Sequence, residues 1–290
     1  MSLATAAIMD VAIGPYAGKE TGETALLRTI LKSLRPNDIA VLDRYYCSFM
    51  MIALMLNQGT HVCTRMHQIR HTDFRRGRRL GKYDHVLQWN RPLRSKWMSK
   101  DLYGQIPETL ELREIRYKVV EKGRRTKELT IVTTLIDADE FTKEDIAELY
   151  GFRWNSELDI GSIKTTMNLS HVRCKSPEMV HREVWATLLA YNLIRSTIAG
   201  AGSLHDRQPR QISFTSACQY VLASWMIRSS DNVADQKNHS LQLLKQIASC
   251  EVANRPGRLE PRVIKRRRHG YPLMQQPSNV LRAQLRKSCT

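Results

Sequence analysis

Four polar side chains of complementary chemistry lie at helical spacing in one stretch of the sequence. Tyr150, Arg153, Glu157 and Lys164 lie in YGFRWNSELDIGSIK, at offsets of 0, 3, 7 and 14. At about 100° per residue, a helix would present all four within an arc of about 60°. Such a column could ligate a divalent cation through its carboxylate and hold phosphate oxygens through its donors. The alternative is a solvated helix face with an Arg153–Glu157 i,i+4 ion pair.

The elements that must position this column alternate at first between strand and helix. Short strands are predicted at residues 3–6, 8–13, 39–42 and 61–64, and amphipathic or apolar helices after Gly22 and at residues 49–56. The strand at residues 39–42 is a continuous apolar run, typical of burial on both faces, and Asp43 stands at its C-terminal end. Residues 65–127 are basic and mostly β, residues 129–135 resemble a central strand, and helices dominate afterwards. The pattern predicts an α/β domain interrupted by a β insertion.

The charge of the chain is large and unevenly distributed. The 290 residues include 45 Lys and Arg against 28 Asp and Glu, a formal net charge of +17. Residues 65–100 hold eleven basic and two acidic side chains, and residues 251–290 hold ten and two, which accounts for the whole excess. This concentration favours two surfaces that contact a polyanion with strong salt dependence, whereas two solvated basic loops are the alternative. The second segment includes Lys265–Arg268, which we expect to form an exposed basic arm.

Several classes of protein do not fit this composition. The longest apolar run, Phe49–Leu56, has eight residues, whereas a membrane span needs about 20. The N-terminus lacks the basic region of a signal peptide, so a cytoplasmic protein is expected. The six cysteines are scattered without C-x-x-C or zinc-ligand spacing, which predicts reduced thiols.

The four-residue column resembles the signature of a known enzyme family. Y-x2-R-x3-E-x6-K is typical of the bacterial DDE transposases named after insertion sequence four. Other segments resemble the family in the same order, namely Leu42-Asp43-Arg44, Asp73-Phe74-Arg75-Arg76-Gly77, Trp154, Glu157-Leu158-Asp159, residues 163–166 and residues 189–195. The resemblance extends from Met1 to about Trp225 and is specific, because several separated motifs agree.

The resemblance implies a fold, a reaction and a role for each residue. The family has a ribonuclease-H-like core with a β insertion, and an Asp-Asp-Glu triad that holds two Mg²⁺ ions, with Mn²⁺ as a substitute, for strand cleavage and transfer. Asp43 is similar to the second Asp and Glu157 to the Glu, so both are the expected catalytic residues and metal ligands. Tyr150, Arg153 and Lys164 are similar to the family's phosphate-binding residues. The implied partners are double-stranded DNA at transposon ends and target, and a second copy of the chain, with the helices at residues 185–198 as candidate interface.

The implied domain order is a first part of the core at residues 1–64, the basic insertion at 65–127, a second part of the core with the signature helix at 128–228, and a helical, basic tail at 229–290. The insertion, with Trp89 and Trp97, would follow the DNA, although either tryptophan could equally belong to the core.

One part of the family pattern is missing from the sequence. The first catalytic Asp stands in a D-G-T/S motif on the first core strand, and no such motif occurs in the 290 residues. Asp10 is a poor substitute, because it falls within a predicted strand and no Gly-Thr follows it. We therefore expect an N-terminally truncated transposase that lacks the first core strand and is inactive alone.

Three alternatives stay open. The chain could be a non-catalytic DNA-binding remnant that interferes with full-length transposase. It could be a nuclease with another acidic ligand, for which Asp159 is the nearest candidate, although Asp159 would lie on the opposite face of the signature helix from Glu157. It could also be a merely structural basic protein, which the complete signature disfavours.

Overall fold

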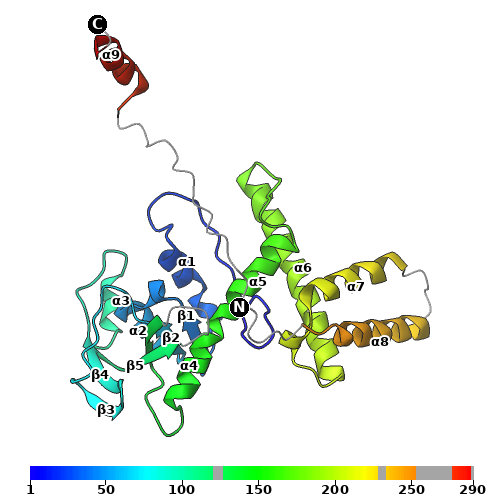
Figure 1. Cartoon of the computed structure of the whole chain (residues 1–290), viewed down its shortest axis with the longest axis horizontal. Helices are drawn as coiled ribbons and strands as arrows, with labels where there is room; N and C mark the ends of the chain where they lie inside the picture. The colour runs from blue at the N-terminus through cyan, green and yellow to red at the C-terminus, as the bar shows by residue number, and fades with distance from the viewer. Residues whose placement is uncertain (120–126, 228–232, 253–275, 289–290) are drawn as a thin grey trace. The chain divides into compact units, whose positions relative to one another are not determined.

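The structure is a computed structural model that describes residues 1–119, 127–227, 233–252 and 276–288 (Figure 1). The chain forms two compact units, Met1–Asn254 and Arg255–Thr290. The first unit contains the β-sheet, and the second contains helix α9 (Ser278–Ser288). The predicted basic arm at residues 265–268 lies outside the described residues.

A six-stranded mixed sheet organises the N-terminal half of the first unit. Its strands are β1 (Ile39–Leu42), β2 (His61–Arg65), β3 (Arg78–Gly81), β4 (Asp84–Asn90), β5 (Thr109–Val119) and β6 (Lys127–Thr133). Their order is β1-β2-β6-β5-β4-β3, with β1 and β2 parallel and the other neighbours antiparallel. The strands β3, β4 and β5 arise from the predicted insertion, and β5 joins them to β6. The insertion therefore continues the same sheet as β1, β2 and β6. The domain boundaries at residues 64, 127 and 228 remain predictions from the sequence.

Helices cover both faces of this sheet. The helices α1 (Glu23–Ile30), α2 (Phe49–Leu56) and α3 (Lys100–Gly104) pack on one face, where Leu112 of β5 is fully buried. Helix α4 (Lys143–Gly151) packs on the other face against Ile115. Because successive side chains of a strand point to opposite faces, Leu112 and Ile115 serve two different cores. The predicted positions of α1, α2, β1, β2 and β6 are confirmed. The predicted burial of β1 on both faces is wrong, because β1 stands at the end of the strand order and only Ala40 in it is buried.

The second half of the first unit is helical. It contains α5 (Arg153–Thr165), α6 (Pro177–Leu204), α7 (Phe214–Ile227) and α8 (Val233–Ser249), and the short 3₁₀ turn η3 (Pro209–Gln211). Tyr191 and Ile198 of α6 are completely buried with Ala217 of α7 and Ile247 of α8. Ser224 also shares a hydrogen bond of 2.8 Å with the imidazole of His239, which links α7 to α8. No helix in the described ranges combines the length and hydrophobicity needed to cross a lipid bilayer.

The predicted strands at residues 3–6 and 8–13 are wrong, because this segment is irregular. The Ser2 amide donates to Ala7 at 2.8 Å, which closes a turn in which Ala6 has a φ of 62°. The next polar backbone groups bond to side chains, since the Ile8 amide donates to Asn192 at 2.8 Å. The alternation of small and β-branched residues suggested strands. It could not show that side chains of a helix, and not a neighbouring strand, form the hydrogen bonds of these backbone groups.

The prediction of one continuous signature helix is also wrong. Helix α4 ends at Gly151 and α5 begins at Arg153, with Phe152 between them in a helical backbone conformation. Tyr150 therefore belongs to the last turn of α4, and Arg153, Glu157 and Lys164 belong to α5. The interruption is confined to Phe152, whose backbone conformation is still helical.

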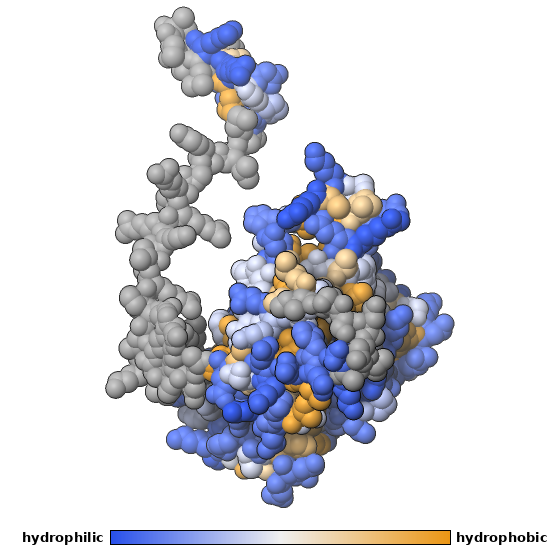
Figure 2. Space-filling model, turned by 90° about the vertical axis from the view of Figure 1, so that its right-hand side faces the viewer, coloured by the Kyte–Doolittle hydropathy of each residue, from blue (hydrophilic) through white to orange (hydrophobic). Residues whose placement is uncertain are grey.

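Large apolar side chains remain exposed on the helical half. Trp185, Leu189 and Leu193 follow one another at four-residue intervals on α6 and are each about half exposed, between 49% and 62%. Figure 2 shows one face of the molecule, on which hydrophobic residues interrupt a largely hydrophilic surface. Exposed apolar residues that line one side of a helix are typical of a surface that contacts another molecule.

Candidate functional site

Asp43 stands where the parallel pair of strands ends. It follows Leu42, which lies opposite Thr64 of β2, and it precedes the 3₁₀ turn η2 (Arg44–Tyr46). The Thr64 hydroxyl donates to the Asp43 carbonyl at 3.1 Å, and the Tyr46 amide donates to the same carbonyl at 3.0 Å. The main chain of Asp43 is thus fixed from both sides, while its side chain is half exposed. Ligand sites of open α/β sheets commonly lie at the carboxyl ends of parallel strands.

A single guanidinium brings Asp43 and Glu157 together. Arg153 donates to the Glu157 carboxylate at 2.7 Å and lies 3.7 Å from the Asp43 carboxylate. Its side chain is 24% exposed, whereas the side chains of Asp43 and Glu157 are 52% and 41% exposed. Partial burial by itself would lower the pKa of the Arg153 guanidinium. The hydrogen bond with Glu157 and the nearby carboxylates outweigh this effect, so the pKa is raised. Residues 114 positions apart therefore form one solvent-accessible cluster of two carboxylates and one cation.

Tyr150 lies beneath this cluster. Its side chain is buried, and its ring belongs to the apolar core with Cys63, Ile115 and Ile146. The Arg153 guanidinium carbon lies 5.9 Å from the ring centroid. Burial raises the pKa of the Tyr150 phenol, so the hydroxyl stays protonated and can donate a hydrogen bond.

Lys164 does not join the cluster. It lies in the last turn of α5, seven residues after Glu157, which corresponds to about 10 Å along a helix. Its side chain is exposed and forms no ion pair with any residue in the described ranges. The predicted column is therefore divided into a cluster at its N-terminal end and a separate cation at its C-terminal end.

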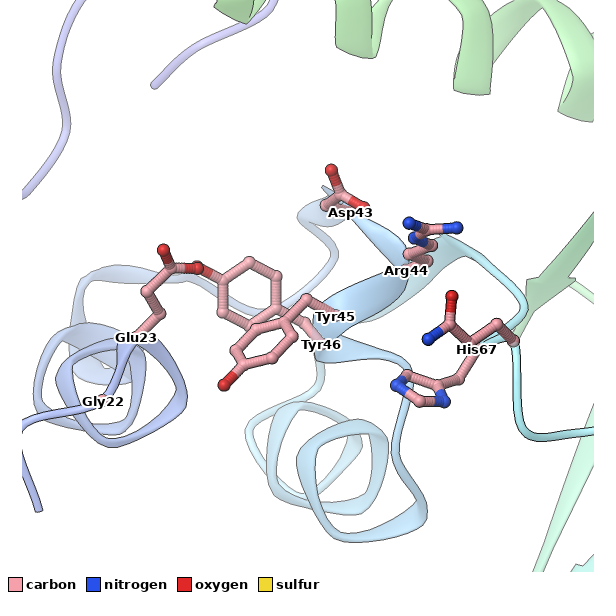
Figure 3. Close-up of a pocket in the computed structure, with 8 residues that line it drawn as sticks. Gly22, Glu23, Asp43, Arg44, Tyr45, Tyr46 and His67 are labelled. Carbon is pink, nitrogen blue, oxygen red and sulfur yellow. The ribbon is translucent and has the colours of Figure 1, made fainter. Parts of the chain in front are cut away.

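A cavity of about 620 Å³ opens beside Asp43. Its walls include Glu23 of α1, Tyr45, Tyr46 and His67. Figure 3 shows the carboxylate of Asp43 at the edge of this cavity, with the two tyrosine rings below it. The rings pack edge to face, with centroids 5.7 Å apart and planes 80° apart. The cavity thus places aromatic surface directly beside a candidate metal ligand.

The cluster has the right chemistry for a divalent cation but few ligands. Carboxylate oxygens suit Mg²⁺, which is often held by one or two carboxylates while water and substrate fill the other positions. Asp43 and Glu157 satisfy this requirement for one ion once Arg153 releases them. In the part of the chain that the structure describes, no group of three or more Asp, Glu, His or Cys side chains could hold a metal. The residues present therefore fit one ion better than a pair.

A loop between β2 and β3 carries much of the basic charge of residues 65–100. Its cations Arg70, Arg75 and Arg76 are exposed, as are the following Arg78 and Arg79 of β3. Asp73 binds Arg75 with a hydrogen bond of 2.9 Å and lies 3.6 Å from Arg76. The hydrogen bonds from Arg75 lower the pKa of Asp73 to about 2. The surface is positive, but one carboxylate holds two of its cations.

Specific contacts fix the shape of this loop. Gly77 has a φ of +76°, and a Cβ at this position would lie 2.2 Å from the Val86 carbonyl oxygen. Only glycine fits both conditions. The imidazole of His85 lies 2.7 Å from the Arg76 carbonyl, and the ring of Phe74 packs against His85 at 4.7 Å. The arginines are consequently presented from a defined backbone.

Both tryptophans of the insertion are occupied by contacts within the protein. Trp89 is buried, donates to Glu114 at 2.9 Å, and lies under the guanidinium of Arg70 at 3.8 Å. Trp97 is partly buried and lies under the guanidinium of Arg28 at 3.9 Å. Neither ring is free to stack on a nucleotide base in this arrangement, which favours their interpretation as core residues.

The other acidic candidates are engaged elsewhere. Asp10 accepts hydrogen bonds from the Ser33 hydroxyl and from the Val11 amide, and the bond from Ser33 is the main reason why its pKa is lowered. Asp159 is buried and binds two arginines on the face of α5 opposite to Glu157. Neither residue joins the cluster of Asp43 and Glu157.

The sequence alone did not reveal three features of the site. The first is the role of Thr64 in anchoring Asp43, and the second is the aromatic cavity formed by Tyr45 and Tyr46, although the two tyrosines follow Asp43 almost directly. The third is the pairing of Asp159 with arginines that are 36 and 51 residues away in the sequence. The sequence carried no clear signal for the third, because three of the four neighbours of Asp159 at helical spacing are the polar residues Asn155, Ser156 and Ser162.

Comparison with known proteins gives a consistent result. The transposase DDE domain family matches residues 2–193, about two thirds of the chain. The transposase InsG for insertion sequence element IS4 of Escherichia coli strain K12 is 28% identical over 266 residues, which cover 89% of this chain and 57% of InsG. The chain therefore spans little more than half the length of that relative.

Shorter similarities involve related elements. The putative transposase InsL for insertion sequence element IS186A of Escherichia coli strain K12 is 34% identical over 68 residues. The transposase for insertion sequence element IS421 of Escherichia coli is likewise 34% identical over 68 residues. Each match covers 23% of this chain and 18% of the relative.

Proposed function

The chain belongs to the transposase DDE domain family, and on this premise we propose that Asp43, Arg153 and Glu157 form the phosphoryl-transfer site of an insertion-sequence transposase that acts on DNA. The observation that carries the proposal is the convergence of two distant carboxylates on one arginine, at 2.7 and 3.7 Å. A merely structural basic protein has no need for this exposed, partly neutralised pair at the end of parallel strands. We further propose that the sheet and α5 belong to a ribonuclease-H-like core.

Divalent metal dependence is general in this family, and in this chain Asp43 and Glu157 would hold the metal, with Mg²⁺ as the natural ion and Mn²⁺ as a substitute. The chemistry that a bound ion supplies is polarisation of a phosphoryl oxygen and activation of a water or a 3′-hydroxyl. Arg153 would exchange its carboxylate contacts for a phosphate oxygen, because a guanidinium can pair with either anion. The Tyr150 phenol, protonated because of its raised pKa, could donate to the same phosphate.

DNA would be held mainly through its backbone. The exposed arginines at residues 70–79 supply positive charge on a fixed loop, and Lys164 supplies a further cation along α5. Contacts of this kind release counterions, so binding should weaken steeply as salt rises. A protein that acts on bacterial DNA in this way would work in the cytoplasm, at the nucleoid.

We propose that this 290-residue chain binds DNA but does not cut it alone. The three-carboxylate, two-metal mechanism of the family needs a first Asp in a D-G-T/S motif, which the sequence lacks. Two carboxylates support binding of one ion, whereas an in-line displacement with two ions needs a bridging ligand in addition.

The decisive experiment incubates the purified chain with supercoiled DNA in Mg²⁺ or Mn²⁺, and measures DNA binding in parallel at increasing salt. We expect salt-sensitive binding and no nicking, and Arg75→Gln combined with Arg76→Gln should weaken the binding. Metal-dependent nicking that disappears in Asp43→Asn and Glu157→Gln would show that the chain is an active transposase by itself. Absence of DNA binding at low salt would contradict the proposal as a whole.

A second candidate function is interference with a longer transposase by pairing. The exposed apolar residues Trp185, Leu189 and Leu193 on α6 favour it, because they offer a protein partner a continuous stripe. A homodimer on this stripe should be visible by light scattering and should dissociate in Leu189→Glu. A chain that stays monomeric at high concentration would argue against this function and leave the DNA proposal intact.

A further inference from the structure

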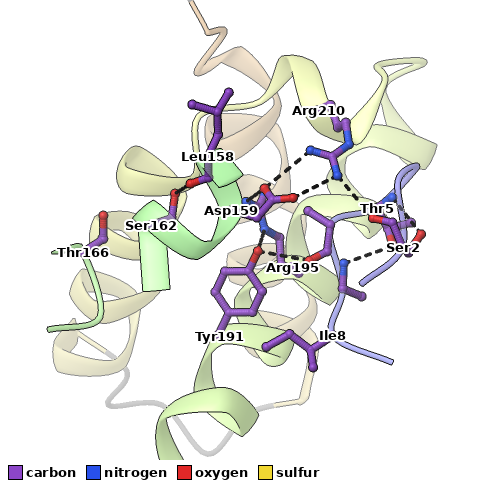
Figure 4. A network of polar contacts seen from close by, with 12 residues as sticks. Ser2, Thr5, Ile8, Leu158, Asp159, Ser162, Thr166, Tyr191, Arg195 and Arg210 are labelled. Atoms are coloured by element: carbon purple, nitrogen blue, oxygen red, sulfur yellow. Dashed lines mark hydrogen bonds and ion pairs between the residues drawn. The ribbon is translucent and has the colours of Figure 1, made fainter. Parts of the chain in front are cut away.

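A buried network lies on the side of α5 that faces away from Glu157. Asp159 accepts from Arg195 of α6 at 3.0 Å and from Arg210 of η3 at 3.0 Å (Figure 4). The side chains of Asp159 and Arg195 are 4% and 6% exposed. Two arginines from different elements therefore hold one carboxylate in a position that water hardly reaches.

The network is rigid on its arginine side. Arg195 also donates to the hydroxyl of Tyr191 at 2.9 Å, and its guanidinium lies 4.6 Å from the ring centroid of Phe214. Arg210 donates to the main-chain carbonyls of Ser2, at 3.2 Å, and Leu3. Several partners thus hold the two guanidinium groups in place, so Asp159 accepts from donors whose positions are already fixed.

Few buried residues determine the rotation of helix α5. Across residues 153–165, all of which the structure describes, Asp159 and Ile163 are buried, whereas Trp154, Leu158 and Ile160 are exposed. The interruption at Phe152 separates α5 from α4, so α4 does not simply extend into it. The ion pairs of Asp159 and the packing of Ile163 in the apolar core together hold α5 against the helical half of the molecule.

Glu157 and Asp159 are two residues apart, so their side chains point about 200° apart around the helix. A carboxylate about 6 Å from a helix axis moves about 3 Å when the helix turns by about 30°. Arg153 and Glu157 both lie on α5 and would move together, so such a movement would break the contact of 3.7 Å between Arg153 and Asp43, which follows β1. The orientation of the candidate site thus depends on what holds the other face of α5.

We propose that Asp159, through Arg195 and Arg210, is a positioning residue that sets the rotation of α5 and so places Glu157 and Arg153 beside Asp43. The inference rests on the proposed function only in its consequence for metal binding. The geometric part concerns the orientation of α5 and can be tested separately.

The test uses the full chain, Asp159→Asn, and two readouts. The first is the ¹⁹F resonance of 5-fluorotryptophan at Trp154, which lies in the first turn of α5 and is assigned by its loss in Trp154→Phe. The second is the affinity for Mn²⁺ measured by electron paramagnetic resonance. We expect the Trp154 resonance to shift and the Mn²⁺ affinity to fall by about tenfold, the lower range for removal of a residue that orients a metal ligand.

The matched control is Asp84→Asn. Asp84 is also a buried carboxylate that binds an arginine, since Arg113 donates to it at 2.9 and 2.6 Å, but both residues of this pair belong to the sheet. This variant should lose stability and leave both the Trp154 resonance and the Mn²⁺ affinity unchanged. Equal effects of the two variants on both readouts would reduce Asp159 to a general structural role and overturn the inference.

Two further variants separate the possible failures. Arg210→Gln alters a partly exposed partner of Asp159 and should change both readouts in the same direction, so the test does not depend on the folding of Asp159→Asn alone. Glu157→Gln should abolish Mn²⁺ binding; if it does not, the proposed metal site fails, while the Trp154 resonance still decides the positioning role. A folded Asp159→Asn or Arg210→Gln protein with an unchanged Trp154 resonance would overturn the inference.

Discussion

Helix α5 has a carboxylate bound to arginine on each of two opposite sides, one exposed to solvent and the other buried. Glu157 is 41% exposed and binds Arg153 four residues earlier, whereas Asp159 is 4% exposed and binds arginines from two other elements. Charged partners in water can be exchanged for a ligand at little cost, but partners out of water cannot separate without leaving a buried charge. Exposure, rather than the presence of an ion pair, therefore separates the face suited to chemistry from the face suited to structure.

The largest expected difference between the two faces is in stability. Asp159→Ala should lower the free energy of unfolding by about 3–5 kcal/mol, because it leaves Arg195 buried without its counter-charge. Glu157→Ala removes a partly exposed i,i+4 partner and should cost less than about 1 kcal/mol. Urea denaturation followed by circular dichroism measures both. Similar losses for the two variants would remove the distinction on which the comparison rests.

The sequence predicted the elements that display regular patterns. The strand at residues 39–42 and the helix at residues 49–56 lie where the sequence pattern indicated. The strands predicted at residues 61–64 and 129–135 correspond to β2 and β6 within one or two residues at each end. The sequence also indicated that Asp159 faces away from Glu157. It did not indicate what Asp159 binds, because long-range ion pairs leave no periodic signal.

The wrong predictions, of strands at residues 3–6 and 8–13 and of one continuous signature helix, concern segments that make long-range contacts. The segment at residues 3–13 alternates like a strand, but its backbone groups bond to Asn192, Tyr191 and Arg210. The break at Phe152 coincides with a change of packing partner, since Tyr150 packs in the core beside the sheet while α5 packs against α6. Tertiary contacts therefore decided the points that local propensity could not.

The second prediction concerns the cation on the exposed face. Arg153→Gln should increase the affinity for Mn²⁺ by about fivefold in the absence of DNA, because a unit charge at about 4 Å in water-like surroundings contributes about 1 kcal/mol. The same variant should bind DNA less tightly, since a phosphate contact is lost. Isothermal titration calorimetry and fluorescence anisotropy measure the two effects.

Arg182→Gln is the matched control for this prediction. Arg182 forms an i,i+4 pair with Glu178 on α6, as Arg153 does with Glu157, but both side chains of that pair are far more exposed. Its Mn²⁺ affinity should equal that of the unaltered chain. A lower Mn²⁺ affinity in Arg153→Gln would mean that Arg153 organises the carboxylates more than it competes for them.

A third prediction extends the comparison to the basic loop, where an exposed carboxylate has a strongly shifted pKa. The hydrogen bonds from Arg75 lower the pKa of Asp73 to about 2, so its charged form is favoured in the folded chain and the ion pair is lost only as the pH falls through that value. Carbon-detected NMR of the Asp73 carboxyl should therefore show no protonation between pH 5 and about 3. A midpoint near the ordinary Asp value would mean that Arg75 is already free in solution.

The smallest expected effect is on DNA binding by that loop. Asp73→Asn should release Arg75 and Arg76 for binding to phosphates, and the logarithmic salt slope of DNA binding should steepen by about 0.9 for each additional phosphate that is neutralised. Asp101→Asn removes the same charge from an exposed position in the first turn of α3, so it controls for net charge alone. If Asp73→Asn and Asp101→Asn strengthen binding equally, only the overall field matters. If Asp73→Asn alone steepens the slope, exposed ion pairs of this protein are exchangeable, as the comparison of the two faces of α5 requires.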